Sequence, residues 1–207
     1  MKFINLFIVI MSLYIAFLIF RRSTLTANHT ARSKRRFWDR ENEANNVRRA
    51  DISALDYIRL DLDALPLQIA RELEAADLVN RLEILADKKI INLSAYTNTD
   101  LKMMYGPANL DELSEYDNNY LTLIRLVNSL GDAMLEKEDT NSAKAFYEYG
   151  ISIGSDISNT YVKLGQIYLD SNDSTSFDKL MQHAKNLESL SGPMIITKLN
   201  NIKSNAK

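Results

Sequence analysis

The carboxyl-terminal half of the chain repeats one pattern of residues at an interval of 34 positions. Val127-x2-Leu130-Gly131-x2-Met134 recurs as Tyr161-x2-Leu164-Gly165-x2-Tyr168. Further along the chain, three residues of the first stretch (Ala143, Tyr147, Gly150) correspond to three of the second (Phe177, Met181, Ala184). A fixed period of this length is typical of proteins built from repeated supersecondary units, which stack to bury a continuous core. The period therefore constrains the architecture more than any single motif does.

This pattern resembles the tetratricopeptide repeat (TPR), a helix-turn-helix unit of the same period with a large residue, Leu-Gly, an aromatic residue and small residues at these offsets. The resemblance covers two units, at about 124–157 and 158–191. It implies a mainly α fold in which antiparallel helix pairs form an α-α superhelix. The proline usual near the end of the second helix is absent from both units, where Ser155 and Ser189 stand, and Phe177 replaces a small residue. An unrelated helical bundle is the alternative.

Two units alone bury little apolar surface, because about three repeats are usually needed for a stable array. The helical domain is therefore expected to extend over residues 68–207, with an upstream helix at one end and a capping helix at 193–205 at the other.

Proteins of the TPR family commonly bind peptides along a groove lined by the first helix of each unit. In this register the resemblance places nine residues in the groove: Arg125, Asn128, Asp132, Leu135, Asn159, Val162, Lys163, Gln166 and Leu169. A protein or peptide partner is thus implied. The variety that captures a free carboxyl terminus needs a Lys and an Asn one turn apart in its first unit, and here those positions are Asn128 and Asp132. A peptide of mixed polar and apolar character is the better expectation.

An uninterrupted run of uncharged, mostly apolar residues, Phe3 to Phe20, lies near the amino terminus. As a helix it would reach about 27 Å, close to the thickness of the hydrocarbon core of a bilayer. The run is longer than the apolar region of most signal peptides and is followed by Arg21 and Arg22 rather than by a small-residue cleavage site. Residues 1–20 are therefore predicted to hold a transmembrane helix (3–20), with a cleaved signal peptide as the alternative. Lipoprotein processing is excluded because the chain has no cysteine.

The charges beside this run predict its orientation. Nine Lys and Arg residues lie in segment 21–50, whereas only Lys2 precedes the run. Basic residues are retained on the cytoplasmic side of a membrane. The expected location is thus the cell membrane, single-pass, with the amino terminus outside and the carboxyl-terminal domain in the cytoplasm.

Segment 21–50 is predicted to be a basic juxtamembrane linker or helix. Its net charge is +6, against −9 for residues 51–207. Basic clusters beside a span can bind anionic lipid headgroups, and the residues expected to do so are Arg21, Arg22, Arg32, Lys34, Arg35 and Arg36. A solvated linker that only sets the topology is an equal alternative, and the acidic remainder of the chain disfavours nucleic acid as a partner. The layout from Phe37 to Ile58, FWDRENEANNVRRADISALDYI, also resembles uncharacterised bacterial single-pass membrane-anchored proteins.

The pattern changes between the basic segment and the repeats. Residues 51–67 alternate apolar and polar side chains, which predicts an extended lead-in. Residues 68–88 carry apolar residues at helical spacing, which predicts one amphipathic helix. Residues 90–117 mix apolar residues with turn formers, which predicts an ordered but irregular connector.

The composition offers little for catalysis. Without cysteine the chain has no thiolate zinc site, disulfide or cysteine nucleophile. Its two histidines, His29 and His183, are far apart in the sequence, and no metalloprotease, phosphate-loop or dinucleotide-binding motif is present. Asp61 and Asp63 form a single D-x-D, which is more often a solvated edge than a cation site. The sequence therefore predicts no catalytic, cofactor-binding or metal site.

These observations predict a membrane-anchored, non-catalytic helical-repeat adaptor or scaffold that binds a protein partner. The alternative is a TPR chaperone or assembly factor on the extracytoplasmic, periplasmic side. An unrecognised enzyme is the third hypothesis, and it would need a deep pocket lined by converging ionisable groups.

Overall fold

A computed structural model describes residues 11, 14–15, 17–18, 22 and 32–205. Among these residues the chain is mainly α-helical and contains no β-strand, which confirms the predicted mainly α class. The chain divides into two compact units. Unit 1 comprises the described residues of 1–50 together with 98–109, and unit 2 comprises those of 51–97 and 110–207.

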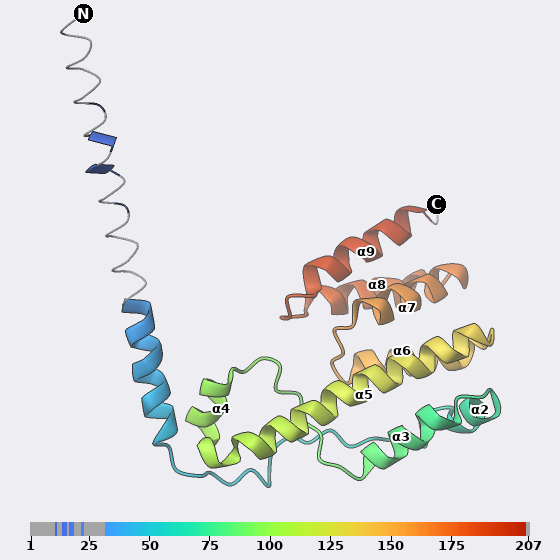
Figure 1. Cartoon of the computed structure of the whole chain (residues 1–207). Coiled ribbons are helices and arrows are strands. Elements are labelled where there is room, and N and C mark those ends of the chain that lie inside the picture. The colour runs from blue at the N-terminus through green and yellow to red at the C-terminus, as the bar shows by residue number, and fades with distance from the viewer. Residues whose placement is uncertain (1–10, 12–13, 16, 19–21, 23–31, 206–207) are drawn as a thin grey trace, which may run out of the picture. The chain divides into compact units, whose positions relative to one another are not determined.

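The described helical elements follow the chain as drawn in Figure 1. Unit 1 holds a helix of residues 32–45, α4 (Asn98–Tyr105) and the 3-10 helix η1 (Pro107–Asn109). Unit 2 holds α2 (Leu67–Glu72), α3 (Ala76–Ala86), α5 (Leu110–Glu136), α6 (Thr140–Ser152), α7 (Ser158–Asp170), α8 (Ser174–Lys185) and α9 (Gly192–Asn205). In unit 2, α3 packs on α5, and α5 to α8 each pack on the next helix, while α9 lies against both α7 and α8.

The membrane anchor predicted from the sequence needs correction. No helix in the described part of the chain is both long and apolar enough to cross a bilayer. Of the described helices, α5 reaches 27 residues, but it is amphipathic and begins with Asp111 and Glu112 in its first turn. Most of the run 3–20 lies outside the described residues. The predicted single-pass location, with its orientation, is thus contradicted. The lipid contacts expected of the basic segment stay a prediction, and Arg21 lies outside the described residues.

Ion pairs and hydrogen bonds join the helix of residues 32–45 to α4 within unit 1. Arg40 forms an ion pair with Asp100 at 2.5 Å. Glu41 accepts a hydrogen bond from the Thr99 hydroxyl at 2.8 Å and is paired with Lys102. The hydrogen bonds from Lys102 and Thr99 hold the pKa of Glu41 below its usual range, so the pair stays charged at neutral pH.

Asn109, the last residue of η1, is fully buried. Its Nδ2 donates to the carbonyl oxygens of Ala50 at 2.8 Å and Tyr105 at 2.7 Å, and its Oδ1 accepts from Arg49 Nε at 2.8 Å. The Ala50 amide also donates to the Tyr105 carbonyl at 2.9 Å. All the polar atoms of this buried side chain therefore have partners, as burial requires.

The single helix predicted over residues 68–88 is two helices in the structure. After α2, Glu74 has a φ of 68°, which is uncommon for a residue other than glycine. The Ala75 amide donates to the Ala70 carbonyl at 2.9 Å, a hydrogen bond typical of a helix that ends in the left-handed conformation. The break allows α3 to start in a new direction and bury Val79, Leu82 and Leu85.

The irregular connector predicted over residues 90–117 contains regular helix. Residues 98–105 form α4, and α5 begins at Leu110 instead of near residue 124. Leu113 and Tyr116, one helical turn apart, are both buried on α5. Gly106 and η1 separate the two helices, whereas residues 90–97 are irregular as predicted.

The helices after α5 recur with the period of the sequence. α6 begins at residue 140 and α8 at 174, whereas α7 begins at 158 and α9 at 192. The turns before α6 and α8 also match, because Glu138 and Asn172 have φ values of 62° and 57°. The backbone therefore repeats at the same interval as the apolar pattern.

The amino-terminal caps of α6 and α8 repeat in the same way. The Asp139 carboxylate accepts from the Ser142 amide at 3.1 Å, and the Asp173 carboxylate accepts from the Ser176 amide at 3.0 Å. Hydrogen bonds from the side chains and amides of these serines hold the pKa of both aspartates below the usual range. Such caps satisfy amide groups that have no partner within the helix.

The two glycines that the period makes equivalent meet different neighbours. A Cβ on Gly131 would lie 2.4 Å from Cε1 of Tyr147, whose ring is fully buried. A Cβ on Gly165 would lie 2.9 Å from Cδ2 of Leu199 and 3.0 Å from Cδ1 of Ile202. These last atoms are the ends of aliphatic side chains on α9, and Cε2 of the buried Phe177 ring lies 3.3 Å away. The contacts at Gly165 are therefore less close than those at Gly131, and two of them are with aliphatic side-chain ends.

Candidate functional site

The nine groove residues predicted from the sequence lie on two helices of unit 2, and we name them the α5–α7 face. Helix α5 carries Arg125, Asn128, Asp132 and Leu135, and α7 carries Asn159, Val162, Lys163, Gln166 and Leu169. Arg125, Asn159 and Gln166 are exposed, whereas the other six are partly buried. The face therefore has an exposed polar part and a more enclosed part.

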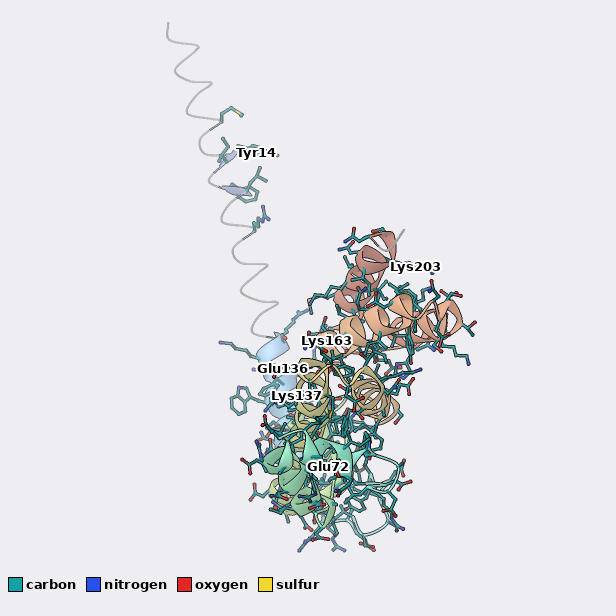
Figure 2. The ribbon with its side chains drawn as sticks, turned by 90° about the vertical axis from the view of Figure 1, so that its right-hand side faces the viewer. Tyr14, Glu72, Glu136, Lys137, Lys163 and Lys203 are labelled. Carbon is teal, nitrogen blue, oxygen red and sulfur yellow. The ribbon has the colours of Figure 1, made fainter. Side chains whose placement is uncertain are left out.

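Asp132 is the centre of a polar network that links three helices. Its Oδ1 accepts a hydrogen bond from the Tyr147 hydroxyl of α6 at 2.6 Å and lies 2.9 Å from Nζ of Lys163 on α7. Its Oδ2 accepts from Nδ2 of Asn128 at 3.2 Å. Lys163 is labelled in Figure 2. Hydrogen bonds to a charged acceptor are stronger than those between neutral groups. The Asp132 carboxylate therefore stabilises the packing of α6 and α7 on α5.

Asn128 extends this network to a buried residue of α7. Its Oδ1 accepts from the Thr160 hydroxyl at 2.8 Å, and Thr160 is 1% exposed. Asn128–Thr160 and Asp132–Lys163 thus both join α5 to α7 through side chains. A partly buried polar network whose members all have partners favours one arrangement of its helices.

The protonation state of Tyr147 supports this arrangement. Burial raises the pKa of the Tyr147 hydroxyl well above its usual range, and the hydrogen bond to Asp132 acts in the same direction. Deprotonation would place two negative charges side by side in a partly dehydrated site. Tyr147 therefore remains a hydrogen-bond donor to Asp132 across the physiological pH range.

The other residues of the α5–α7 face lie outside the network. Leu135 and Leu169 pack against the hydrophobic core, and Gln166 donates to Asp170 on its own helix at 2.7 Å. Arg125 and Asn159 occupy equivalent positions in the period and are both exposed. The structure thus brings Asn128, Asp132 and Lys163 together and leaves Arg125 and Asn159 facing solvent.

Two members of the network, Tyr147 and Thr160, are missing from the prediction. The sequence pattern treats Tyr147 only as a large packing residue, yet its hydroxyl reaches the partly buried edge of α5. The available signal is a polar atom at a helical position that otherwise faces the core, since a buried polar group needs a partner. That signal predicts that the polar atom has a hydrogen-bond partner, but it does not identify the partner residue.

The described part of the chain holds no group of three or more His, Asp or Glu side chains able to bind a metal ion. Asp61 and Asp63 are both exposed. His183 lies on α8 with its Nδ1 2.9 Å from the Tyr161 hydroxyl, whereas His29 falls outside the described residues.

Replacing Asp132 with alanine is expected to destabilise unit 2 by about 2 kcal/mol, because the buried Tyr147 hydroxyl and the Lys163 ammonium would both lose their acceptor. Urea denaturation of the full chain measures this change. Asp170→Ala is the matched control, since Asp170 is an exposed carboxylate with one hydrogen bond on its own helix. Equal losses for the two variants would contradict a network that joins the helices.

The chain matches no protein-family model, no curated protein and no solved structure.

Proposed function

We propose that unit 2 is a TPR-like helical repeat that acts as a non-catalytic adaptor or scaffold and binds a protein partner. The observation that supports this most directly is the periodic recurrence of helix starts, left-handed turn residues and aspartate caps from α6 to α9. Helix α9 occupies the position of the first helix of a third unit, because it begins at residue 192, one period after the start of α7 at residue 158. Stacked repeats of this kind offer extended binding surfaces.

The partner is proposed to lie on the α5–α7 face. The Asp132 network holds the two helices in place, so a partner would bind a surface that is already ordered. Ordering the surface in advance lowers the entropic cost of binding. The exposed side chains of Arg125, Asn159 and Gln166 supply hydrogen-bonding groups around this surface.

The charges of the face indicate the chemistry of the partner. The Lys163 ammonium already neutralises the Asp132 carboxylate at 2.9 Å. The exposed guanidinium of Arg125 is therefore the dominant charge, and it favours neutral or acidic residues in the partner beside α5. Val162, which is partly buried on α7, adds apolar surface. A peptide segment of mixed polar and apolar residues fits these properties.

Site-specific photocrosslinking tests this proposal. A photoreactive phenylalanine analogue is placed at Asn159 on the α5–α7 face or at Gln182, which is exposed on α8. We expect one protein to be crosslinked from position 159 and not from position 182. The Arg125→Glu variant should reduce this adduct strongly while leaving the helical circular dichroism unchanged, because Arg125 is exposed.

Two results would contradict the proposal. One is an adduct that forms from position 182 but not from position 159. The other is an adduct from position 159 that is insensitive to Arg125→Glu, which would mean that contact there does not depend on the face.

A further inference from the structure

A cavity of about 410 Å³ opens between α6 and α8, beside α7. This volume falls within the range of small-molecule pockets, roughly 300–1,000 Å³. The cavity shares no lining residue with the α5–α7 face. It is therefore a second candidate site, independent of the proposed partner surface.

The floor of the cavity is apolar. Leu164 of α7 and Leu180 of α8 line it and are 1% and 5% exposed, and Ile151 of α6 lines it and is 8% exposed. These side chains belong to the hydrophobic core of unit 2, so the floor is firmly packed. An aliphatic group placed on this floor would be removed from water, which contributes most of the binding free energy in such pockets.

The acidic groups beside the cavity already have partners. Glu148 on the α6 wall accepts from the Tyr168 hydroxyl at 2.6 Å and lies 3.8 Å from Nζ of Lys144. Asp173 caps α8 and accepts from Ser176. Both carboxylates are thus stabilised, Glu148 by a hydrogen bond and a nearby ammonium group and Asp173 by the amino-terminal end of a helix.

The α8 wall carries one ammonium group, that of Lys179, and one imidazole ring, that of His183. Lys179 and His183 both line the cavity and are four residues apart, so they lie on the same side of the helix. The Tyr161 hydroxyl lies 3.2 Å from the Ser155 carbonyl, to which it donates, and 2.9 Å from Nδ1 of His183. The Tyr161 hydroxyl and Nδ1 of His183 therefore form a hydrogen bond, in which the donor depends on the tautomer of the imidazole. This hydrogen bond orients the imidazole ring, and the nearby ammonium of Lys179 favours an anionic ligand group at this wall.

We propose that this cavity binds a small carboxylate with an aliphatic body. The body would lie on Ile151, Leu164 and Leu180, and the carboxylate would bind Lys179 beside His183. This chemistry occurs at the carboxyl terminus of a peptide that ends in leucine and in free branched-chain acids.

Binding to the isotope-labelled full chain, followed by amide chemical-shift changes, tests the proposal with three probes. The probes are N-acetyl-glycyl-leucine, the same dipeptide with its carboxyl group converted to an amide, and isocaproate, a free acid with the same branched body. We expect the dipeptide acid to change the backbone amide chemical shifts of α8 around Lys179. The dipeptide whose carboxyl group is converted to an amide should bind about tenfold more weakly, or not at all, because a charged hydrogen bond is lost. If isocaproate binds as tightly as the dipeptide acid, the ligand is a free acid, whereas tighter binding of the dipeptide assigns the site to a peptide terminus.

Substitutions on one helix provide the matched comparison. Lys179→Gln is expected to weaken the acid by about tenfold, because it removes the cation and keeps a side chain of similar length. Lys185→Gln removes another exposed lysine of α8, one that does not line the cavity, and should leave binding unchanged. The proposal is overturned if none of the probes binds, if the amide binds as well as the acid, or if the two lysine variants behave alike.

Discussion

Replacing Gly131 with alanine is expected to destabilise unit 2 by about 3 kcal/mol, because an added methyl group has no space at this position. The new Cβ would lie 2.4 Å from Cε1 and 2.8 Å from Cδ1 of Tyr147. The ring cannot turn away easily, since it is fully buried and its hydroxyl is held by Asp132 at 2.6 Å. Alanine is the better helix former by about 1 kcal/mol, so any observed loss understates the steric conflict. Urea denaturation of the full chain measures the change.

Two other glycines of unit 2 are controls for this prediction. Gly165→Ala places its Cβ against the movable ends of Leu199 and Ile202, so it should cost clearly less than Gly131→Ala. Gly150→Ala meets one atom, Cγ1 of Val127, at 3.4 Å, and should be neutral or stabilising because of helix propensity. Equal losses of unfolding free energy for Gly131→Ala and Gly165→Ala would contradict the prediction, because they would mean that the side chains around each glycine do not affect the cost.

Replacing Gly106 with alanine is expected to cost about 3 kcal/mol of the local stability of unit 1, from strain and steric conflict together. Gly106 has a φ of +83°, where a side chain is strained. Its Cβ would also lie 2.6 Å from the carbonyl oxygen of Arg48, a backbone atom that moves only with the whole segment. The neighbouring hydrogen bond from the Ala50 amide to the Tyr105 carbonyl should open more often. Hydrogen exchange at the Ala50 amide measures that opening.

Gly154→Ala separates the two causes. Gly154 has a φ of +88°, but its Cβ would meet only the side-chain ends of Asn92 and Tyr120, both at 3.5 Å. This variant should show the cost of the backbone conformation alone, about 1 kcal/mol. Equal losses at the two glycines would show that the close approach to Arg48 contributes nothing.

The mainly α class and the beginnings of α6 and α8 follow from the amino-acid sequence, because the interactions that decide them are local. Helical spacing of apolar residues predicts a buried stripe, and Asp139 and Asp173 stand where a capping carboxylate can reach an amide three residues later. The same register places Asn128, Asp132 and Lys163 on one side of their helices. Those features need no knowledge of distant residues.

The partners of these residues depend on the tertiary structure. Asp132 has the position expected for a groove residue, yet its carboxylate is bound to Tyr147 and Lys163. Repeat symmetry treats Gly131 and Gly165 as equal, but a Cβ at 131 would lie 2.4 Å from a buried ring, whereas a Cβ at 165 would lie 2.9 Å from the end of a leucine side chain. The break after α2, where Glu74 has a positive φ, is likewise not predictable from the sequence, because glutamate rarely adopts a positive φ without support from the surrounding structure. Local sequence determines which side of a helix is apolar and where the helix begins, whereas the side chains that meet across helices are decided by packing between residues far apart in the chain.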